Sequence, residues 1–400
     1  GDAVAVDHHA FVDRHGAANV HYLLVGGRPS PNFPVNVHHI KGPSRLGAIA
    51  SVALRAPTGR ASLQEALLHS RAAAREIRRL RDEIAPTVEI YDTVRMSQFA
   101  SGDSRNQICY LDDLFSERYT AMLAAARTYP DVDIRPLGNF ATHVPPRLRP
   151  LADDRRGQIA LLRAERALVR RSEDRAAAAF PRCLLVNPGE ADVLTRRADV
   201  PAGRVQSIPP LVAEPVAEPR RVGSTPVFVF LGLLSLPHND DGLRWFLTSV
   251  WPLVQATAPD ARLRVIGRSA RPELVELAEG FNGTVSVEGY VPDLSAALAE
   301  ATALVNPLRF GSGIKLKVME ALARGVPVVS TAIGADGIRS GDDAGILVAD
   351  EPARFAELMH ALTDEQANAR ASAAATAHYD TTYSRNAVFA AYDSAFRLTP

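Results

Sequence analysis

The sequence predicts an α/β protein built from two doubly wound, parallel-sheet domains of Rossmann-like type. Three observations predict this class. The chain has 400 residues, which is more than one hydrophobic core usually organises. Strand-like apolar runs alternate with amphipathic helical segments in both halves, and a proline-rich stretch separates the halves. Ligands on such sheets bind at the carboxyl ends of the strands, so a central cleft between the domains is the expected site.

The composition limits the classes of function. The 45 basic and 45 acidic residues cancel, which argues against nucleic acid as a partner. Cys109 and Cys183 stand far apart in the sequence, so we expect neither a disulfide framework nor a zinc site from them. No apolar run reaches the roughly 18 residues of a membrane span, and no charged, apolar leader opens the sequence. We therefore expect a cytoplasmic protein.

The first half begins with a helical pattern at Asp2–His15. Because an α/β domain normally opens with a strand, we expect a first strand to be missing ahead of it. A long amphipathic helix is predicted over Leu63–Ile84. Its five arginines indicate a solvated surface or, alternatively, a peripheral contact with anionic lipid. The other predicted elements of this half are strands at Val20–Val25, Val35–Ile40, Val88–Tyr91, Gln107–Leu111 and Cys183–Asn187, and a helix at Leu151–Phe180.

The best linker is Pro209–Pro226, which holds five prolines and no periodicity. It divides the chain into an N-terminal domain (1–208), the linker (209–226), a C-terminal domain (227–378) and a terminal helix (379–400). Strands are predicted at Val227–Leu231, Arg262–Ile266, Thr284–Glu288, Ala303–Val305, Val326–Ser330 and Gly345–Val348. Helices are predicted at Asp240–Val250, Pro272–Ala278, Asp293–Glu300 and Lys317–Arg324.

The segment Asn306–Thr331 has the pattern strand, glycine loop, helix, turn, strand. Gly311 and Gly313 let the backbone approach a bound group, and the following helix start favours an anion. Lys315 and Lys317, two of only three lysines in the chain, add positive charge. A glycine loop before a helix is also common connector geometry, but the scarcity of lysine favours an anion site, most simply for a diphosphate. Neither a Walker loop nor a dinucleotide fingerprint is present.

These residues lie within a segment, Val227–Leu347, that resembles the nucleotide-sugar half of family 4 retaining glycosyltransferases of GT-B fold. The resemblance rests on FVFLGLLSLPHNDDGLRWFLTSVWPLV, LRVIG, VEGYVPDLSAAL, NPLRFGSGIKLKVMEALARGVPVVST and GADGI, and it is nearest to bacterial exopolysaccharide-type sugar transferases. The N-terminal half is similar only through RHGAANVHYLLV and FPRCLLVNPGEADVL. The resemblance implies that residues 1–208 serve the acceptor, that 227–378 bind the nucleotide sugar, and that 379–400 cross back to the N-terminal domain.

The resemblance also implies roles for single residues. Glu320 matches the second acid of the family's E-x7-E motif, which grips the ribose, whereas Ser312 stands where the first acid would touch the donor sugar. Tyr290 and Val291 match the loop that lies against the base. Asp112 stands where the family often has a histidine near the reacting centre.

The charges near the donor phosphates depart from the family pattern. Leu233 and His238 stand where the family commonly has an arginine and a lysine. We interpret Lys315, Lys317 and Arg309 as the residues that replace this charge.

Two polar pairs have a second, structural interpretation. Asp112 and Asp113 are also typical of a helix-capping pair, and Asn239 and Asp240 are expected to cap the helix that follows them.

Two features invite a metal, which we do not expect. His38 and His39 are neighbours on a strand and so point to opposite faces; His8 and His9 form a similar pair. The Asp131–Asp133 segment has D-x-D spacing but is interpreted as a polar turn.

The expected function is that of a hexosyltransferase, which moves a sugar from a nucleoside diphosphate sugar to an acceptor hydroxyl, with retention and without a metal or other cofactor. Lys315 and Lys317 would stabilise charge on the leaving diphosphate. The acceptor is a sugar, a lipid-linked molecule or a natural product. The alternatives are a GT-B-type sugar-nucleotide epimerase and a non-catalytic nucleotide-sugar-binding protein.

Overall fold

The computed structural model describes residues 11–27, 35–101, 106–128, 154–212, 214 and 218–396. The chain forms two compact units. The first comprises Gly1–Ile208 together with Ala391–Pro400, and the second is Pro209–Ala390. The division falls at the start of the proline-rich segment, and each unit has its own buried apolar core. His8, His9 and the Asp131–Asp133 segment lie outside the described residues.

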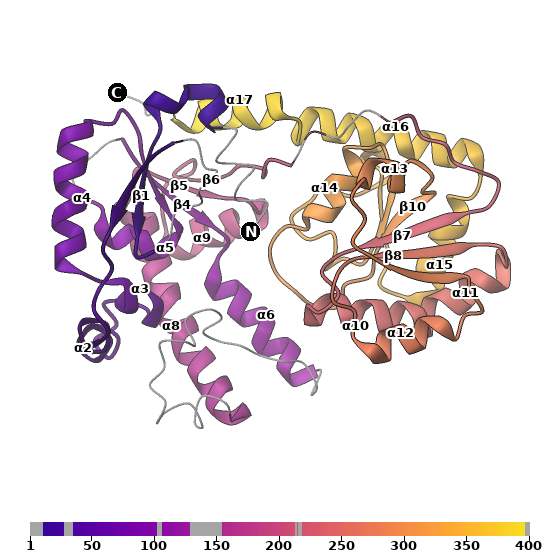
Figure 1. The fold of residues 1–400 in the computed structure, drawn as a ribbon, viewed down its shortest axis with the longest axis horizontal. Coiled ribbons are helices and arrows are strands. Elements are labelled where there is room, and N and C mark those ends of the chain that lie inside the picture. Colours follow the sequence, from indigo (N-terminus) through magenta and orange to yellow (C-terminus); the bar gives the residue numbers. More distant parts are fainter. Residues whose placement is uncertain are drawn as a thin grey trace. The chain divides into compact units, whose positions relative to one another are not determined.

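In the first unit, the described strands form two parallel sheets (Figure 1). One sheet pairs β1 (His21–Val25) with β2 (Asn36–Ile40), and the other has the order β3-β4-β5-β6, from Glu89–Asp92, Gln107–Asp112, Arg182–Leu185 and Val205–Ser207. The helices are α2 (Arg45–Arg55), α3 (Leu63–Leu68), α4 (Arg71–Ile84), α5 (Thr93–Met96), α6 (Phe115–Thr128), α8 (Arg155–Ala179) and α9 (Pro188–Ala198). The predicted strands of this half are confirmed within one or two residues, whereas α2, α9 and β6 were not predicted.

The single helix predicted over Leu63–Ile84 is wrong. The chain leaves the helical conformation at His69, whose ψ is 125°, and starts a second helix with Ser70 as its N-cap. The Ser70 hydroxyl accepts a hydrogen bond from the Ala73 amide at 3.2 Å. A serine placed this way satisfies an otherwise unpaired amide of a new helix.

The two cysteines are neighbours in space. Cys109 on β4 and Cys183 on β5 are register partners, and both are fully buried and free. Its hydrogen bond with Cys183, together with burial, raises the pKa of the Cys109 thiol well above its usual value. The sequence separation of the two residues hid this contact.

The second unit contains a six-stranded parallel sheet in the order β12-β11-β10-β7-β8-β9. In chain order these strands are β7 (Val227–Leu231), β8 (Arg262–Ile266), β9 (Val285–Gly289), β10 (Ala303–Asn306), β11 (Val328–Ser330) and β12 (Ile346–Val348). The helices are α10 (Pro237–Trp245), α11 (Trp251–Thr257), α12 (Pro272–Glu279), α13 (Leu294–Ala299), α14 (Leu316–Leu322), α15 (Pro352–Ala361), α16 (Glu365–Thr382) and α17 (Arg385–Phe396).

Alternate residues of β7 enter the cores on opposite faces of this sheet. Phe228 and Phe230 pack with α10, α11, α12 and α15, whereas Val229 and Leu231 pack with α13, α14 and α16. The two groups of helices lie on opposite faces of the sheet (Figure 1). Helices on both faces explain why β7 is apolar without a polar side.

The helix predicted at Asp240–Val250 begins earlier, at Pro237, and ends in a π-helical turn at Phe246–Val250. The N-cap is Leu236, so Asn239 and Asp240 lie inside the first turn and do not cap the helix. Proline at the first helical position accounts for the earlier start, since its ring fixes a helical φ and it needs no amide partner.

The last residues of α17 pack within the first unit. The rings of Phe11 and Tyr392 lie 4.9 Å apart, and the Arg182 guanidinium donates to the Ser394 carbonyl at 2.9 Å. Within the part of the chain that the structure describes, no helix is long and apolar enough to span a bilayer.

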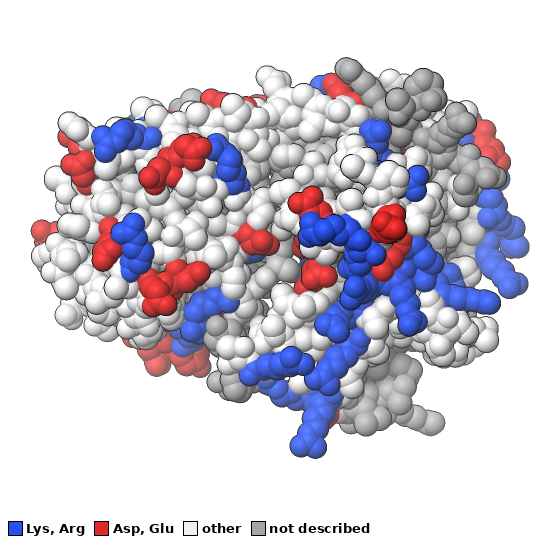
Figure 2. Space-filling view, turned by 180° about the vertical axis from the view of Figure 1, so that it is seen from behind, with Lys and Arg blue, Asp and Glu red and all other residues white. Residues whose placement is uncertain are grey.

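Arginines are concentrated along α8. Arg163, Arg170, Arg171 and Arg175 are exposed and Arg166 is half-buried. Figure 2 shows basic side chains gathered on one face over the part of the first unit that contains α8. This arginine row is the main charged surface feature of that unit.

Candidate donor-binding site

The strand order of the second unit defines a switch point. From β7 the chain proceeds through β8 to β9 on one side, and β10, β11 and β12 fill the other side. The connection after β7 therefore runs to β8 on one side, and the connection after β10 runs to β11 on the other side. The carboxyl ends of two such strands are where open α/β sheets bind ligands. The loop after β10 is the glycine loop predicted from the sequence.

The glycine loop has a conformation that requires glycine. Gly311 has φ 137° and Gly313 has φ 70°, and side chains rarely tolerate either value. The Lys315 ammonium folds back over the loop and donates to the Ser312 carbonyl at 3.2 Å and to the Gly313 carbonyl. Lys315 is only 8% exposed. Because α14 has seven residues, the lysines contribute more positive potential here than the short helix dipole does.

Lys317 has few polar contacts for an ammonium group. Its Nζ lies 2.8 Å from Oδ1 of Asn239 and 4.3 Å from the centroid of the Phe230 ring. No carboxylate of a described residue forms an ion pair with it. Burial, with a smaller contribution from Lys315, lowers the pKa of Lys317 to about 7. An arriving anion would supply the missing negative charge.

Asn239 links the two loops at the switch point. It is 3% exposed; its Oδ1 accepts from Lys317 and its Nδ2 donates to the Leu233 carbonyl at 3.0 Å. A Cβ on Gly232 would lie 2.8 Å from Nδ2, so glycine is needed beside it. The sequence interpretation placed Asn239 at the carboxyl end of a strand, where a helix cap could face the cleft, but it did not pair this residue with Lys317. Pro237 was the available signal, because a helix starting there places Asn239 beyond the cap position.

His238 also faces this positive cluster. Burial and then the charges of Lys317 and Lys315 lower the pKa of His238 to about 4. Its ring meets that of Phe310 edge-on, with 6.4 Å between centroids. At neutral pH His238 is therefore uncharged, and it would contribute hydrogen bonds rather than the positive charge that a lysine supplies.

Two other predicted residues have ionic partners. Arg309 forms a two-point pair with Asp241, at 2.9 and 2.6 Å, and Glu320 pairs with Arg324 at 2.6 Å. The charge that we assigned to Arg309 for phosphate binding is thus compensated by a carboxylate. Glu320 keeps one oxygen, Oε1, outside its pair with Arg324.

The loop after β9 presents an aromatic surface. Tyr290 is 62% exposed, and the Arg268 guanidinium lies 4.1 Å from the centroid of its ring. Val291 is partly buried against the core on the α14 face, which anchors the loop. Ser312 is half-buried in the glycine loop.

Asp112, in the first unit, ends β4 with a strained backbone. Its φ is 66°, in the left-handed region, and its carbonyl accepts from the Val186 amide at 2.9 Å. Burial and then the neighbouring Asp113 raise the pKa of Asp112 to about 6. Asp113 forms an ion pair with Arg118.

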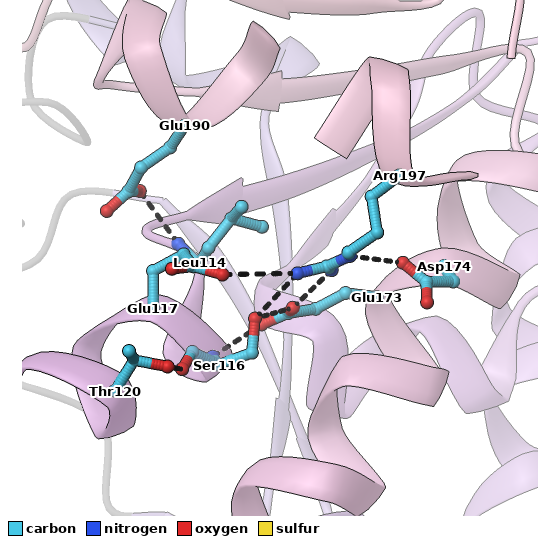
Figure 3. A network of polar contacts seen from close by, with 8 residues as sticks. All are labelled: Leu114, Ser116, Glu117, Thr120, Glu173, Asp174, Glu190 and Arg197. Atoms are coloured by element: carbon cyan, nitrogen blue, oxygen red, sulfur yellow. Dashed lines mark hydrogen bonds and ion pairs between the residues drawn. The ribbon is translucent and has the colours of Figure 1, made fainter. Parts of the chain in front are cut away.

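The capping interpretation of this Asp pair is wrong. The amides that begin α6 bind carboxylates of other helices: Leu114 donates to Glu190 at 2.8 Å and Ser116 donates to Glu173 at 3.0 Å (Figure 3). Because these carboxylates occupy the helix start, Asp112 is left for another role.

His38 and His39, the histidine pair that the structure describes, have different partners. His38 Nε2 lies 3.0 Å from His21 Nδ1, whereas His39 contacts the Gly27 carbonyl, so the two neighbours have different surroundings as predicted. Among the described residues no group of three or more His, Cys, Asp or Glu is arranged to hold a metal ion.

Comparisons with known proteins find a family model and a relative that match part of the chain. Residues 225–365 match the family model described as Glycosyl transferases group 1. An uncharacterized 44.6 kDa protein in the cps region of Klebsiella pneumoniae is 27% identical over 135 residues. That alignment covers 32% of this chain and 35% of the relative, so the chain matches about a third of the relative's length.

Several solved structures share the fold over nearly the whole chain. Anabaena Alr3699/HepE in complex with UDP has TM-score 0.61 and 12% identity, covering 98% of this chain and 95% of that one. Sucrose-phosphate synthase from Thermosynechococcus elongatus has TM-score 0.59 and 13% identity, covering 99% and 93%. WaaG, a glycosyltransferase involved in lipopolysaccharide biosynthesis, has TM-score 0.53 and 14% identity, covering 98% and 95%. The predicted fold class, GT-B with parallel α/β sheets, is confirmed.

Proposed function

We propose that this chain is a retaining hexosyltransferase that moves a sugar from a nucleoside diphosphate sugar to an acceptor hydroxyl. The observation that carries the proposal is the positive cluster at the switch point of the second unit, where Lys315 and Lys317 meet a loop of two positive-φ glycines. The family match over residues 225–365 and the GT-B fold support it.

In this proposal the diphosphate lies against the glycine loop. Lys317 gains a proton as the anion binds, because the anion stabilises the ammonium form. Both lysines then stabilise the negative charge that grows on the leaving diphosphate, which also takes the acceptor's proton on the same face of the sugar. No metal or other cofactor takes part.

The remaining assignments follow the sequence resemblance. Glu320 Oε1 accepts hydrogen bonds from the ribose, and the loop of Tyr290 and Val291 contacts the base. Asp112 is the polar group of the first unit assigned to the donor sugar. The acceptor is a sugar, a lipid-linked molecule or a natural product.

The donor base is tested first by binding. UDP, GDP, ADP and dTDP are compared by thermal shift; UDP is the natural first probe because the HepE structure is a complex with UDP. We expect one nucleotide to raise the melting temperature and Lys317→Ala to abolish the rise. No response to any of the four would contradict the proposal.

Activity is then tested with sugar nucleotides of the selected base. We expect an α-configured donor to give an α-configured product. NMR of the anomeric proton of the product measures this configuration. Isomerisation of the donor without acceptor would indicate an epimerase instead. Tight donor binding without turnover on any acceptor would indicate a binding protein.

A further inference from the structure

Helix α2 has an apolar stripe that faces solvent. Leu46, Ile49, Ala50, Ala53 and Leu54 follow the i, i+3, i+4, i+7, i+8 spacing with which helices usually cover a core. Here the stripe is uncovered: Leu46 is 81% exposed, Ile49 49% and Leu54 71%. The opposite face is the one that is buried, through Ala48 and Ser51. Uncovered apolar stripes of this kind usually mark an interaction surface.

The chain beyond the C-terminal end of α2 reaches the arginine row of α8. The turn that follows α2 contacts this row directly, because the Arg175 guanidinium donates to the carbonyls of Gly59 and Arg60 at 3.0 and 3.1 Å. Gly59 also lies against Arg171, whose Nη1 would be 2.7 Å from a Cβ at Gly59.

Four arginines of the row have no ionic partner among the described residues. No carboxylate of a described residue forms an ion pair with Arg163, Arg166, Arg170 or Arg171. The acids on the buried side of α8, Glu165 and Glu173, bind elsewhere in the unit. Figure 2 shows the resulting basic patch.

We propose that α2 and the arginine row of α8 together form a docking surface for an anionic lipid bilayer. The leucines of α2 enter the boundary between headgroups and acyl chains, and the arginines bind the phosphates of the headgroups. A bilayer supplies both the apolar layer and the negative charge that this surface needs. A symmetric contact with a second copy would bring two arginine rows together and is disfavoured by repulsion.

The surface differs from the one predicted from the sequence. On α4 the Arg79 guanidinium is paired with Glu76 and Glu83, at 2.7 and 2.8 Å, and the exposed face has no apolar stripe. Helix α8 differs from α4 because its arginines lack ionic partners among the described residues and because the chain leading from the apolar stripe of α2 contacts it.

The test is co-sedimentation of the full chain with vesicles of phosphatidylcholine alone or with phosphatidylglycerol, at low and high salt. We expect binding only to the anionic vesicles, weakened by salt. Arg163→Gln with Arg170→Gln should reduce the partition coefficient about thirtyfold, and Leu46→Gln with Leu54→Gln about tenfold. The matched control is Arg75→Gln with Arg78→Gln on α4, which removes the same charge and should change binding less than about threefold.

Three results would overturn the proposal: no binding to anionic vesicles at low salt, an equal loss in the α4 control, or full binding by the Leu46/Leu54 variant. Light scattering provides a fourth. If the unchanged protein is a dimer and the Leu46/Leu54 variant is a monomer, the stripe contacts a second copy instead of a bilayer. Circular dichroism verifies folding of each variant. The nucleotide thermal shift of the same samples tests the donor site separately, so failure of one proposal is distinguishable from failure of the other.

Discussion

Lys317 is the buried lysine at the centre of the donor site that we propose for the second unit. Its pKa is lowered from its usual 10.5 to about 7 by burial and by Lys315. Between these values the unfolded chain binds more protons than the folded chain, so Lys317 makes stability rise with pH. Its contribution is complete above the unfolded pKa and is lost as the pH falls through 7. Without ligand, this ammonium costs stability, and the proposed diphosphate site is our explanation for that cost.

Binding of UDP at pH 8 should therefore be accompanied by proton uptake, because the diphosphate raises the pKa of Lys317 towards its usual range. Isothermal titration calorimetry in two buffers of different ionisation enthalpy measures this uptake directly. We expect the observed enthalpies to differ between the buffers, and Lys317→Met to remove the difference. Equal enthalpies for the unchanged protein would show that Lys317 binds the ligand without changing its protonation.

Substitutions of Asn239 should move the pKa of Lys317 in opposite directions. Asn239→Asp places a negative charge beside the ammonium and raises this pKa, whereas Asn239→Leu removes the hydrogen bond and lowers it. The chain has only three lysines, so NMR of ¹³C-methylated lysines can follow each titration. Lys41 lies outside this cluster and is the internal control. Unchanged Lys317 titration in both variants would contradict the assigned contact.

At this scale the sequence identified the lysines but not their partner. The rarity of lysine and the two glycines were local signals for Lys315 and Lys317. Asn239 lies 78 positions from Lys317, and only the pairing of β7 with β10 brings them together. Similarly, nothing local indicated that Asp241 would engage Arg309.

Among the elements, α8 connects the helices of the first unit through buried carboxylates. Glu165 accepts from the Leu63 and Gln64 amides at 2.7 and 3.2 Å, and Glu173 accepts from Ser116 and from Arg197 at 3.0 and 2.7 Å. Arg197 also reaches Asp174 (Figure 3). The first amides of a helix lack partners within it, so α8 stabilises the starts of both α3 and α6.

Replacing Glu173 with leucine should therefore destabilise the first unit by about 3–5 kcal/mol, because Arg197 loses a buried partner and the Ser116 amide is left unpaired. The matched control is Glu117→Leu, which removes a more exposed carboxylate 3.5 Å from the same arginine and should cost less than about 1 kcal/mol. Urea unfolding followed by circular dichroism gives both values. Similar costs for the two changes would contradict the special role of the buried carboxylate.

Element predictions succeeded where one physical signal dominated. The bounds of β7 and β8 are those predicted, since β7 is a short apolar run and β8 alternates arginine with buried apolar residues. The predicted helix bounds were wrong where a capping or first-turn residue, and not the apolar periodicity, decides where a helix starts. Ser70 starts a new helix after His69, and Pro237 starts α10 before its apolar pattern begins. The apolar pattern of α2 faces solvent, so periodicity alone would have placed its core face wrongly.

For the whole molecule, we predict two separable unfolding steps, because each unit has its own buried apolar core. Both tryptophans, Trp245 and Trp251, lie in the second unit, so intrinsic fluorescence reports on that unit alone. UDP should raise the fluorescence midpoint and leave the remaining circular dichroism transition in place, since the lysine cluster belongs to the second unit. A single transition shared by both signals would instead show that the units unfold together.

The fold class could be predicted because alternation of strands and helices specifies a parallel sheet. The strand order could not. The sequence contains no local mark for the reversal that sets β10 beside β7, yet this reversal creates the switch point and brings the glycine loop to Asn239.

The cysteine pair in β4 and β5 gives the first unit a built-in reporter. Since Cys109 and Cys183 are fully enclosed in the sheet, a thiol reagent reaches them only when those strands separate. The rate of modification thus measures how often the sheet opens, in the unit that contains no tryptophan. A ligand that engaged only the other half would leave that rate unaltered, whereas an acceptor held on the first unit would slow it.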